Sequence, residues 1–394
     1  MPTVLITGAA SGIGRAASHR FADAGWRCVL VDRNAEALSA LVPTLRAAAE
    51  PHLSIPLDLT DADAIARIGD AVPALDALVN NAGMSDTSGT PLVEQTPEQQ
   101  ARLVALNLEA PAAMVQALAG RLAPGARIVN VSSGAGLRAI PWRGMYSPTK
   151  AGVITQSTAL ARARPDWCVT VLCPGFVRTE LVESLITAGR LSPRAAVARV
   201  PLGRMAEPDE MADALVFLAS EAARPLAGQV LSLDGGTSVF TGGVPYEPTE
   251  LATAPADTAL ALRVLGDDDG RWSALATEAV DGYPAVLDAS ALHADSPWQA
   301  VHRAAAAFVR EHAESASLTV LLPEARDEGD WRAAGDLGAA RMLIATLACE
   351  LGAKGLRINA VTLGTGATAQ THGALLQYVA GARAQYLTGQ VLSA

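Results

Sequence analysis

Short apolar runs alternate with amphipathic stretches through the first half of the sequence. Four runs rich in Val, Ile and Leu lie at residues 4–7, 28–31, 75–79 and 128–131. Continuous apolar runs of this length are typical of strands that are buried on both faces. The stretch 15–24, which follows the first run, has the amphipathic spacing of a helix. The pattern therefore predicts an α/β fold.

The chain has 394 residues, a length that favours two globular units over one. Its 30 Lys and Arg residues are outnumbered by 40 Asp and Glu residues, so the formal net charge is −10. An acidic chain is a poor partner for nucleic acid or an anionic membrane surface. No apolar stretch approaches the roughly 20 residues that cross a bilayer, and the N-terminal sequence lacks the basic region of a signal peptide. We therefore expect a cytoplasmic protein that binds neither membranes nor nucleic acids.

The cysteines and histidines are scattered along the sequence. No pair of them has the close spacing that protein metal sites use. We therefore expect no metal site, and we expect reduced, mostly buried thiols at Cys28, Cys168, Cys173 and Cys349.

A glycine-rich turn separates the first apolar run from the amphipathic stretch. Its glycines, Gly8, Gly12 and Gly14, follow the pattern TGxxxGxG. Such a turn lets the backbone approach a diphosphate closely, and the next helix supplies N–H groups and the positive end of its dipole. Taken alone, the same pattern also fits a glycine- and alanine-rich loop that packs a helix on a strand.

The second apolar run ends at Asp32, 18 residues beyond Gly14. An acidic residue there accepts hydrogen bonds from both hydroxyls of an adenosine ribose and repels a 2′-phosphate. The position therefore predicts NAD rather than NADP. Arg33 adjoins the carboxylate and partly offsets the repulsion, but residues 9–11 include no Arg or Lys.

Tyr146 and Lys150 lie four positions apart at the start of a predicted helix that continues to residue 163, so they share a helix face. A phenol with an ordinary pKa of about 10 is a poor proton shuttle near neutral pH, and a nearby ammonium favours the phenolate. We therefore expect Lys150 to lower the pKa of Tyr146 and to make that residue a general acid/base.

Several of these motifs occur in a fixed order. The sequences TGAASGIG, NNAG at residues 80–83, Ser133, YSPTK at residues 146–150 and PG at residues 174–175 resemble the short-chain dehydrogenase/reductase family over residues 1 to about 244. The resemblance implies a doubly wound parallel sheet of the Rossmann type. It also implies hydride transfer between a nicotinamide cofactor and the carbon of an alcohol or carbonyl group.

The resemblance assigns roles to four catalytic residues. Tyr146 is the acid/base, Lys150 also binds the nicotinamide ribose, and Ser133 hydrogen-bonds the substrate oxygen. Asn107 holds a water in the proton relay. Two of them also have a structural interpretation, because Ser133 could cap a loop and Asn107 could bond to the local backbone.

Further cofactor contacts are carried over from the family by position. Asp58 would read the adenine amino group, although acidic residues at strand ends are often structural. The whole expected set comprises Gly8, Ser11, Gly12, Ile13, Gly14, Asp32, Arg33, Asp58, Leu59, Asn80, Ala82, Gly83, Tyr146, Lys150, Pro174, Gly175, Val177 and Thr179.

Arg138, Trp142 and Arg143 precede Tyr146, where family members contact substrate. An arginine there could clamp an anionic group, or it could be a solvated surface charge. Residues 180–200 correspond to the family's lid over the substrate. We expect a small, polar substrate, and an anionic one remains an open alternative.

The second half resembles the family a second time. Residues 226–236 match the family's closing strand, and residues 242–245 (GGVP) have the composition of a linker, so we divide the chain into residues 1–244 and 245–394. Residues 347–361 then resemble the helix and strand that follow the catalytic lysine. Residues 386–393 echo the first closing strand.

This second copy has lost its chemistry. Leu337 stands at the lysine position and Ala333 at the tyrosine position. Three aspartates at residues 267–269 stand where the glycine turn is needed, and they would repel a diphosphate. The short length predicts a truncated Rossmann-like domain that serves as a pseudo-subunit, so that two chains mimic a four-subunit assembly. The alternative is a passenger domain without functional contacts.

The sequence thus predicts an NAD-dependent oxidoreductase that interconverts a small-molecule secondary alcohol and a ketone. The alternative is an NAD(H)-binding sensor or scaffold whose second half is an interaction surface. The set of Asn107, Ser133, Tyr146 and Lys150 favours the enzyme, because sensing needs nucleotide contacts but no proton relay.

Overall fold

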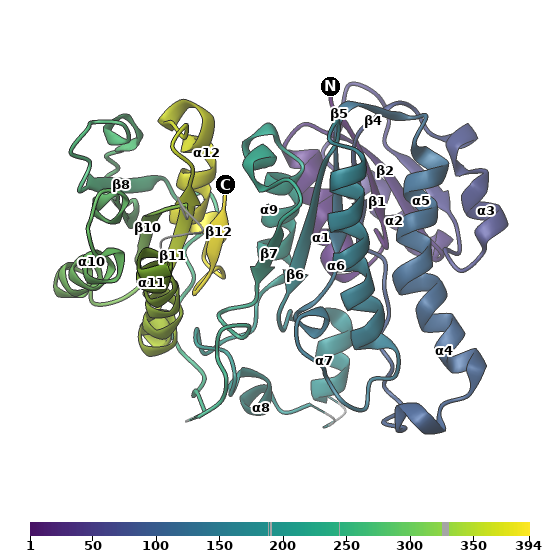
Figure 1. Cartoon of the computed structure of the whole chain (residues 1–394). Helices are drawn as coiled ribbons and strands as arrows, with labels where there is room; N and C mark the ends of the chain where they lie inside the picture. The colour runs from purple at the N-terminus through teal and green to yellow at the C-terminus, as the bar shows by residue number, and fades with distance from the viewer. Residues whose placement is uncertain (188, 190, 244, 325–330) are drawn as a thin grey trace. The chain divides into compact units, whose positions relative to one another are not determined.

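The computed structural model describes the chain apart from residues 188, 190, 244 and 325–330. Within the described residues the strands form two sheets, one of seven strands and one of five (Figure 1). The first sheet has the order β3-β2-β1-β4-β5-β6-β7, and its pairs from β3 through β6 are parallel. Its strands are β1 (Thr3–Thr7), β2 (Arg27–Asp32), β3 (Leu53–Pro56), β4 (Leu75–Asn80), β5 (Leu122–Val131), β6 (Cys168–Pro174) and β7 (Val230–Leu233).

Helices cover both faces of the first sheet. In Figure 1, α5 and α6 lie in front of the strands and α1 lies behind them. Local sequence helps to set where a helix begins. At the start of α4, for example, Thr96 and Gln99 form a capping box. The helices are α1 (Gly12–Asp23), α2 (Ala35–Leu41), α3 (Ala62–Ala66), α4 (Pro97–Val104), α5 (Ala110–Leu118), α6 (Tyr146–Ala163), α7 (Glu180–Thr187), α8 (Pro193–Val197) and α9 (Pro208–Leu218).

The apolar strands form the core of the first sheet. Every residue of β1 and of β6 is buried, which explains why their sequences are continuous apolar runs rather than alternating ones. On one face, Leu5 and Leu78 of the sheet pack with Met114 and Leu118 of α5. The strand order reverses between β1 and β4, and ligands of such sheets bind in the crevice that this reversal leaves at the strand ends.

The second sheet is also parallel, but its strand order, β12-β11-β10-β9-β8, has no reversal. This strand order therefore has no reversal point of the kind at which ligands bind in the first sheet. The predicted doubly wound sheet followed by a smaller one is confirmed. The elements are β8 (Leu260–Leu265), β9 (Tyr283–Asp288), β10 (Ser317–Pro323), β11 (Arg357–Leu363), β12 (Val391–Ser393), α10 (Pro297–Glu311), α11 (Trp331–Leu351) and α12 (Ala369–Ala380).

The chain divides into two compact units that are interleaved in sequence. One comprises Met1–Ser184 and Glu207–Leu231, and the other comprises Leu185–Ala206 and Ser232–Ala394. Most of the expected lid segment thus belongs to the second unit. Val244, at the expected linker, lies outside the described residues.

Within the second unit, residues 198–206 are tied to segments from later in the chain. The backbone N–H of Thr249 donates to the carbonyl oxygen of Gly203 at 2.8 Å. The hydroxyl of the buried Tyr386 donates to the carbonyl oxygen of Arg204 at 3.1 Å. The segment that directly follows the expected lid is therefore held by Thr249 and Tyr386 of the same unit.

Candidate active site

The glycine turn between β1 and α1 is tightly closed. Gly8 and Gly12 adopt positive φ angles of 64° and 51°, a region that glycine enters without strain. A Cβ atom on Gly14 would lie 1.9 Å from the carbonyl oxygen of Gly8, so no side chain fits between the helix and the strand end. The turn therefore offers the N-terminus of α1 as a cradle that fits a diphosphate.

Thr7 and Asn81 hold this turn, although neither is among the residues predicted from the sequence. The Asn81 side chain donates from Nδ2 to the carbonyl oxygens of Thr7 at 3.0 Å and Gly8 at 3.2 Å. Thr7 Oγ1 accepts the backbone N–H groups of Asn81 at 3.0 Å and Ala82 at 3.1 Å. The available signal was the place of Asn81 within NNAG, directly after the end of a strand.

Asp32 links the end of β2 to the glycine turn. Its carboxylate accepts the backbone N–H of Ala10 at 3.1 Å and that of Asn34 at 3.0 Å. Both bonds fix the carboxylate at the carboxyl edge of the sheet, beside the turn. This is the position from which a carboxylate can reach the hydroxyls of an adenosine ribose.

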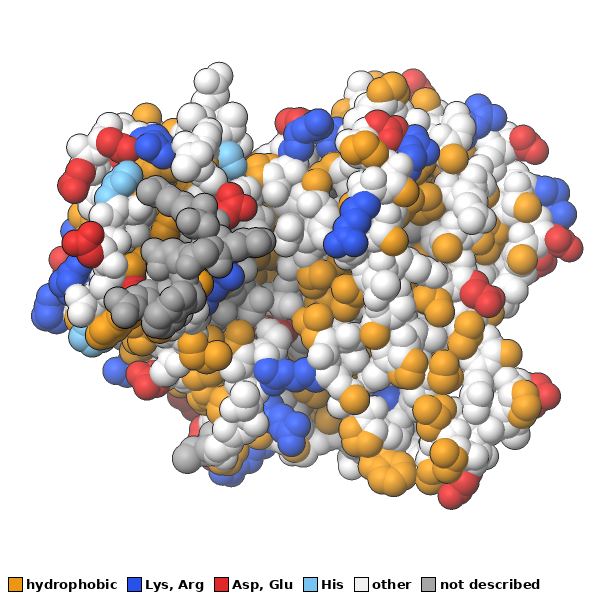
Figure 2. Space-filling view, in the orientation of Figure 1, with side chains coloured by type: hydrophobic (Ala, Val, Ile, Leu, Met, Phe, Trp, Pro, Cys, Tyr) orange, Lys and Arg blue, Asp and Glu red, His pale blue; other side chains and the backbone are white. Residues whose placement is uncertain are grey.

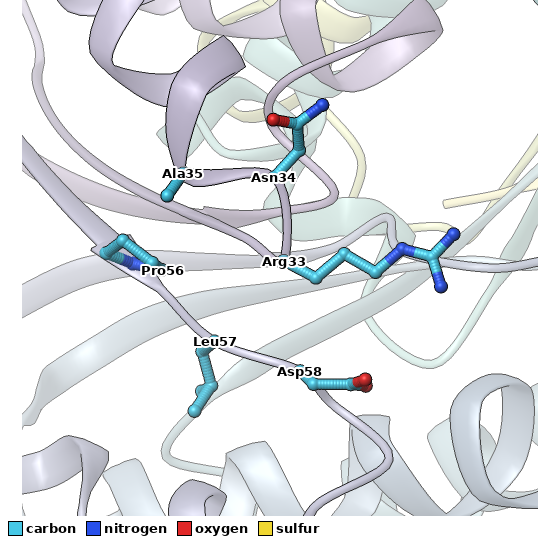
Figure 3. Close-up of a pocket in the computed structure, with 6 residues that line it drawn as sticks. All are labelled: Arg33, Asn34, Ala35, Pro56, Leu57 and Asp58. Carbon is cyan, nitrogen blue, oxygen red and sulfur yellow. The ribbon is translucent and has the colours of Figure 1, made fainter.

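An open pocket of about 640 Å³ lies at the ends of β2 and β3 (Figure 3). The side chains of Arg33 and Asp58 extend to the same side of it. A backbone hydrogen bond from Thr60 holds the pKa of Asp58 below its usual value. The pocket fits the adenosine end of a dinucleotide, and its lining residues are Arg33, Asn34, Ala35, Pro56, Leu57 and Asp58.

Asn80 ties the central strands to α6. It donates from Nδ2 to Oδ1 of Asn130 at 2.8 Å, and Asn130 donates to the hydroxyl of Ser157 at 2.8 Å. All three side chains are buried, so this chain of hydrogen bonds joins β4, β5 and α6 inside the protein.

Asn107 lies in a π-helical turn (Ala105–Glu109) between α4 and α5. Its side chain accepts the backbone N–H of Met84 and donates to the carbonyl oxygen of the same residue, both at 2.8 Å. It also donates to the hydroxyl of Thr149 at 3.3 Å. The predicted asparagine therefore locks the loop after β4 onto the helix that carries the expected acid/base.

Lys150 is buried on α6, and its ammonium donates to the carbonyl oxygen of Val131 at 3.0 Å. Burial lowers the pKa of Lys150 to about 8. A Cβ atom on Gly83 would lie 3.1 Å from Nζ of Lys150 and 3.3 Å from Oδ1 of Asn107. The predicted residues of the NNAG segment, of α6 and of the π-helical turn thus meet at one point.

Tyr146 begins α6, and its pKa is raised above the ordinary value by burial. The hydrogen bond with Ser133 and the charge of Arg143 act in the opposite direction without reversing the shift. The expectation that Lys150 lowers the pKa of Tyr146 is therefore wrong. The physical reason is desolvation of the buried phenol, which outweighs the opposing effects. Near neutral pH, Tyr146 is a proton donor.

Ser133 follows β5 and accepts the backbone N–H of Ala135 at 3.1 Å, so it caps a short turn as well as contacting Tyr146. The neighbouring Ser132 donates to the backbone carbonyl oxygen of Lys150 at 2.8 Å. These contacts hold the end of β5 against α6 and place Ser133 beside the phenol.

The loop before Tyr146 contains the three residues expected to contact substrate. Arg143 donates to the carbonyl oxygen of Asp86 at 3.3 Å, so it also has a structural role. Trp142 has a φ of 64°, which is unusual for a bulky residue, and 60% of it is exposed. Arg138 is exposed. The loop that directly precedes the expected acid/base therefore exposes an indole and a cation.

The segment after β6 returns to the glycine turn. Thr179 lies against Gly12, where an added Cβ would be 3.2 Å from its methyl group. Val177 is buried and accepts the backbone N–H of Thr179 at 2.9 Å. Pro174 ends β6 and is buried. The expected contacts after β6 and those of the glycine turn are therefore brought together.

The remaining predicted residues differ in position. The Leu59 side chain packs in the apolar core, so any contact of this residue with a cofactor would come from its backbone. Ser11 is exposed at the start of α1, where its side chain makes no capping bond, and Ile13 is half-buried in the first turn. Gly175 is half-buried directly after β6.

On the face shown in Figure 2, acidic and basic side chains are interspersed rather than gathered by sign. None of the helices in the described part of the chain combines the length and apolar character that a membrane crossing requires. The same residues include no cluster of three or more His, Cys, Asp or Glu side chains that could hold a metal ion. All four cysteines are thiols, and three of them are buried.

A family model described as enoyl-(acyl carrier protein) reductase matches residues 8–238. The uncharacterised short-chain type dehydrogenase/reductase y4vI of Sinorhizobium fredii is 39% identical over 239 residues, and the match covers 59% of this chain and 43% of that protein. The chain thus spans less than half the length of that relative. Sorbitol dehydrogenase of Cereibacter sphaeroides is 36% identical over 251 residues, which cover 59% of this chain and 96% of that enzyme.

A solved structure gives the same picture. A short-chain type dehydrogenase/reductase from Mycobacterium ulcerans has 31% sequence identity and a TM-score of 0.57, and the match covers 62% of this chain and 91% of that one.

Proposed function

The chain belongs to the short-chain dehydrogenase/reductase family, and we propose that it is an NAD-dependent oxidoreductase that interconverts a secondary alcohol and a ketone. One observation carries the proposal. A phenol hydrogen-bonded to a serine lies on the same helix as a buried lysine, close to a glycine turn that fits a diphosphate. Binding alone requires the turn but not the phenol.

The bound dinucleotide would supply or accept the hydride, held by the glycine turn, Asp32 and the pocket at Asp58. The carboxylate of Asp32 supports NAD over NADP, because it repels a 2′-phosphate. Arg33 adjoins the pocket and is the residue that would weaken this preference.

The protein side of the reaction is a proton transfer at the substrate oxygen. Tyr146, protonated near neutral pH, donates its proton to that oxygen in the reduction direction and becomes a phenolate. In the oxidation direction the reverse step starts from the phenolate, which accepts the proton of the alcohol. Ser133 orients the same oxygen through its hydroxyl. Asn107 and Lys150 line the path by which the tyrosine regains its proton.

We expect Tyr146→Phe to abolish turnover while leaving dinucleotide affinity within about twofold, because the variant keeps the ring but lacks the proton. The measurement is NADH or NADPH formation, followed by absorbance, with NAD or NADP and a panel of polyols, cyclic alcohols and hydroxy acids. Tyr246→Phe is the matched control, since that hydroxyl donates to the carbonyl oxygen of Cys349 in the second unit.

Faster turnover with NADP than with NAD would contradict the cofactor assignment. Bound NADH without turnover of any substrate would contradict the enzyme and favour the NAD(H) sensor. Within the panel, a preference for hydroxy acids that is lost in Arg138→Gln would identify the substrate as anionic.

We also propose that residues 245–394 serve as a pseudo-subunit for the catalytic residues 1–244, so that two chains mimic a four-subunit assembly. The five-stranded sheet supports this role, because its strand order lacks the crevice that a second active site would need.

A further inference from the structure

The first residue of α7, Glu180, lies on the glycine turn. Its Oε2 accepts the backbone N–H of Gly12 at 3.0 Å. Its other carboxylate oxygen pairs with the guanidinium of Arg15, one turn further along α1. All three residues belong to the same compact unit, so the contact is part of one folded body.

The N–H of Gly12 is one of the groups that the proposed function assigns to the dinucleotide. It stands at the N-terminus of α1, where backbone donors and the helix dipole favour a negative charge. A carboxylate and a diphosphate satisfy such a donor in the same way. Both cannot accept the hydrogen bond from this N–H in the same geometry, and two anions in contact repel each other.

The contact is built to be reversible. Half of the Glu180 side chain and half of the Arg15 side chain are exposed, so water can replace both interactions. Thr179, directly before Glu180, lies against Gly12, which keeps the start of α7 at the turn. The segment from α7 onward is the expected lid, and from Leu185 it belongs to the other compact unit.

We propose that the Glu180 carboxylate competes with the dinucleotide diphosphate for the N–H of Gly12, so that dinucleotide binding releases the first turn of α7. The inference rests on the proposed function, because it assumes that a dinucleotide occupies the glycine turn. Glu180 acts here as a positioning residue that makes lid release conditional on the cofactor.

Removing the charge of Glu180 should strengthen dinucleotide binding. Glu180→Gln keeps the size of the side chain, removes the repulsion of the diphosphate and leaves the Arg15 cation available to it. At an effective dielectric constant between those of water and protein, one such charge contact changes the affinity by about tenfold. Adenosine has no phosphate, so its affinity should not change.

The test is calorimetric titration of the full chain with NADH, ADP-ribose and adenosine. Glu183→Gln is the matched control, because Glu183 is on the same helix, is similarly exposed and pairs with Arg178 instead. The expected result is about tenfold tighter binding of NADH and ADP-ribose by Glu180→Gln alone, with adenosine unchanged in every variant.

The inference is overturned if Glu180→Gln binds ADP-ribose no more tightly than wild type does. It is also overturned if both variants gain affinity equally, because the gain would then come from the change in net charge alone. Failure of wild type and both variants to bind NADH or ADP-ribose overturns the proposed function, and this inference with it.

Discussion

At the scale of single residues, the chain has two lysines, Lys150 and Lys354, and their environments are opposite. Lys150 is buried and its pKa is lowered to about 8 by desolvation, whereas Lys354 is exposed. The folded pKa of Lys150 lies below that of the unfolded chain, so the unfolded chain binds more protons between about pH 8 and 10.5. The free energy of unfolding therefore rises with pH across that window.

We expect Lys150→Met to abolish turnover but to stabilise the protein at pH 7. The lowered pKa of Lys150 costs the folded protein about 3 kcal/mol, and the variant avoids this cost. It also loses the bond to Val131, which contributes about 1–2 kcal/mol, so the free energy of unfolding rises by about 1–2 kcal/mol. Urea denaturation at pH 7 and pH 10 measures it, with Lys354→Met as the control.

The gain should shrink toward pH 10, because folded wild type loses this proton above about pH 8 and then buries a neutral amine instead of a charge. A Lys150→Met variant that is less stable than Lys354→Met at pH 7 would refute the assigned desolvation.

Some properties of the site residues follow from residue type and spacing, whereas others depend on the folded structure. Tyr146, Lys150 and Gly14 were predictable, because their roles follow from residue type and spacing. The direction of the Tyr146 pKa shift was not, since it depends on burial by residues far away in the sequence. Asn81 was missed for the same reason, because only the folded turn brings its amide to Thr7.

At the scale of elements, Arg357 at the start of β11 organises the end of the second unit. The side chain is buried, and its Nε donates to the hydroxyl of Tyr283 at 3.0 Å. Its terminal nitrogens donate to five backbone carbonyl oxygens, those of Val379, Ala380, Gly381, Ala384 and Leu387.

We expect Arg357→Lys to destabilise the protein by about 3–5 kcal/mol, because an ammonium has only three donors and must give up at least two of the five charged hydrogen bonds to buried carbonyl oxygens. Arg263→Lys on β8 is the matched control, since that arginine is exposed and pairs with Glu311, and it should cost less than about 1 kcal/mol. Urea denaturation of the full chain compares them. Equal losses would show that the carbonyl contacts contribute little.

The elements of the first sheet follow from its continuous apolar runs, but the π-helical turn at Asn107 does not follow from periodicity. A single inserted residue shifts a helix by about 100°, and the contacts of Asn107 with Met84 and Thr149 help to offset its cost. Such compensation lies outside the local sequence.

At the scale of the whole molecule, the pseudo-subunit proposal predicts a native mass twice the 40.5 kDa of one chain, measured by light scattering. A chain that ends at residue 244 should lose stability and change its assembly. Residues 198–206 would lose the hydrogen bond from Tyr386. A shortened chain that stays soluble, equally stable and unchanged in assembly would refute the proposal.

The sequence predicted two sheets and a single domain boundary between them, after residue 244. The compact units instead alternate along the chain, with Leu185–Ala206 belonging to the second. This arrangement depends on pairs such as Thr249 with Gly203 and Tyr386 with Arg204, whose separation in sequence leaves no local pattern.

The interleaving has a consequence during synthesis on the ribosome. Arg204 is translated well before Tyr386, and at 5–20 residues per second the segment waits roughly 10–40 s for that partner. The glycine turn and α6 can form in the meantime, but residues 198–206 cannot reach their final contacts. A nascent chain therefore completes this part of the second unit only when translation is nearly finished, and a prematurely terminated chain lacks these contacts.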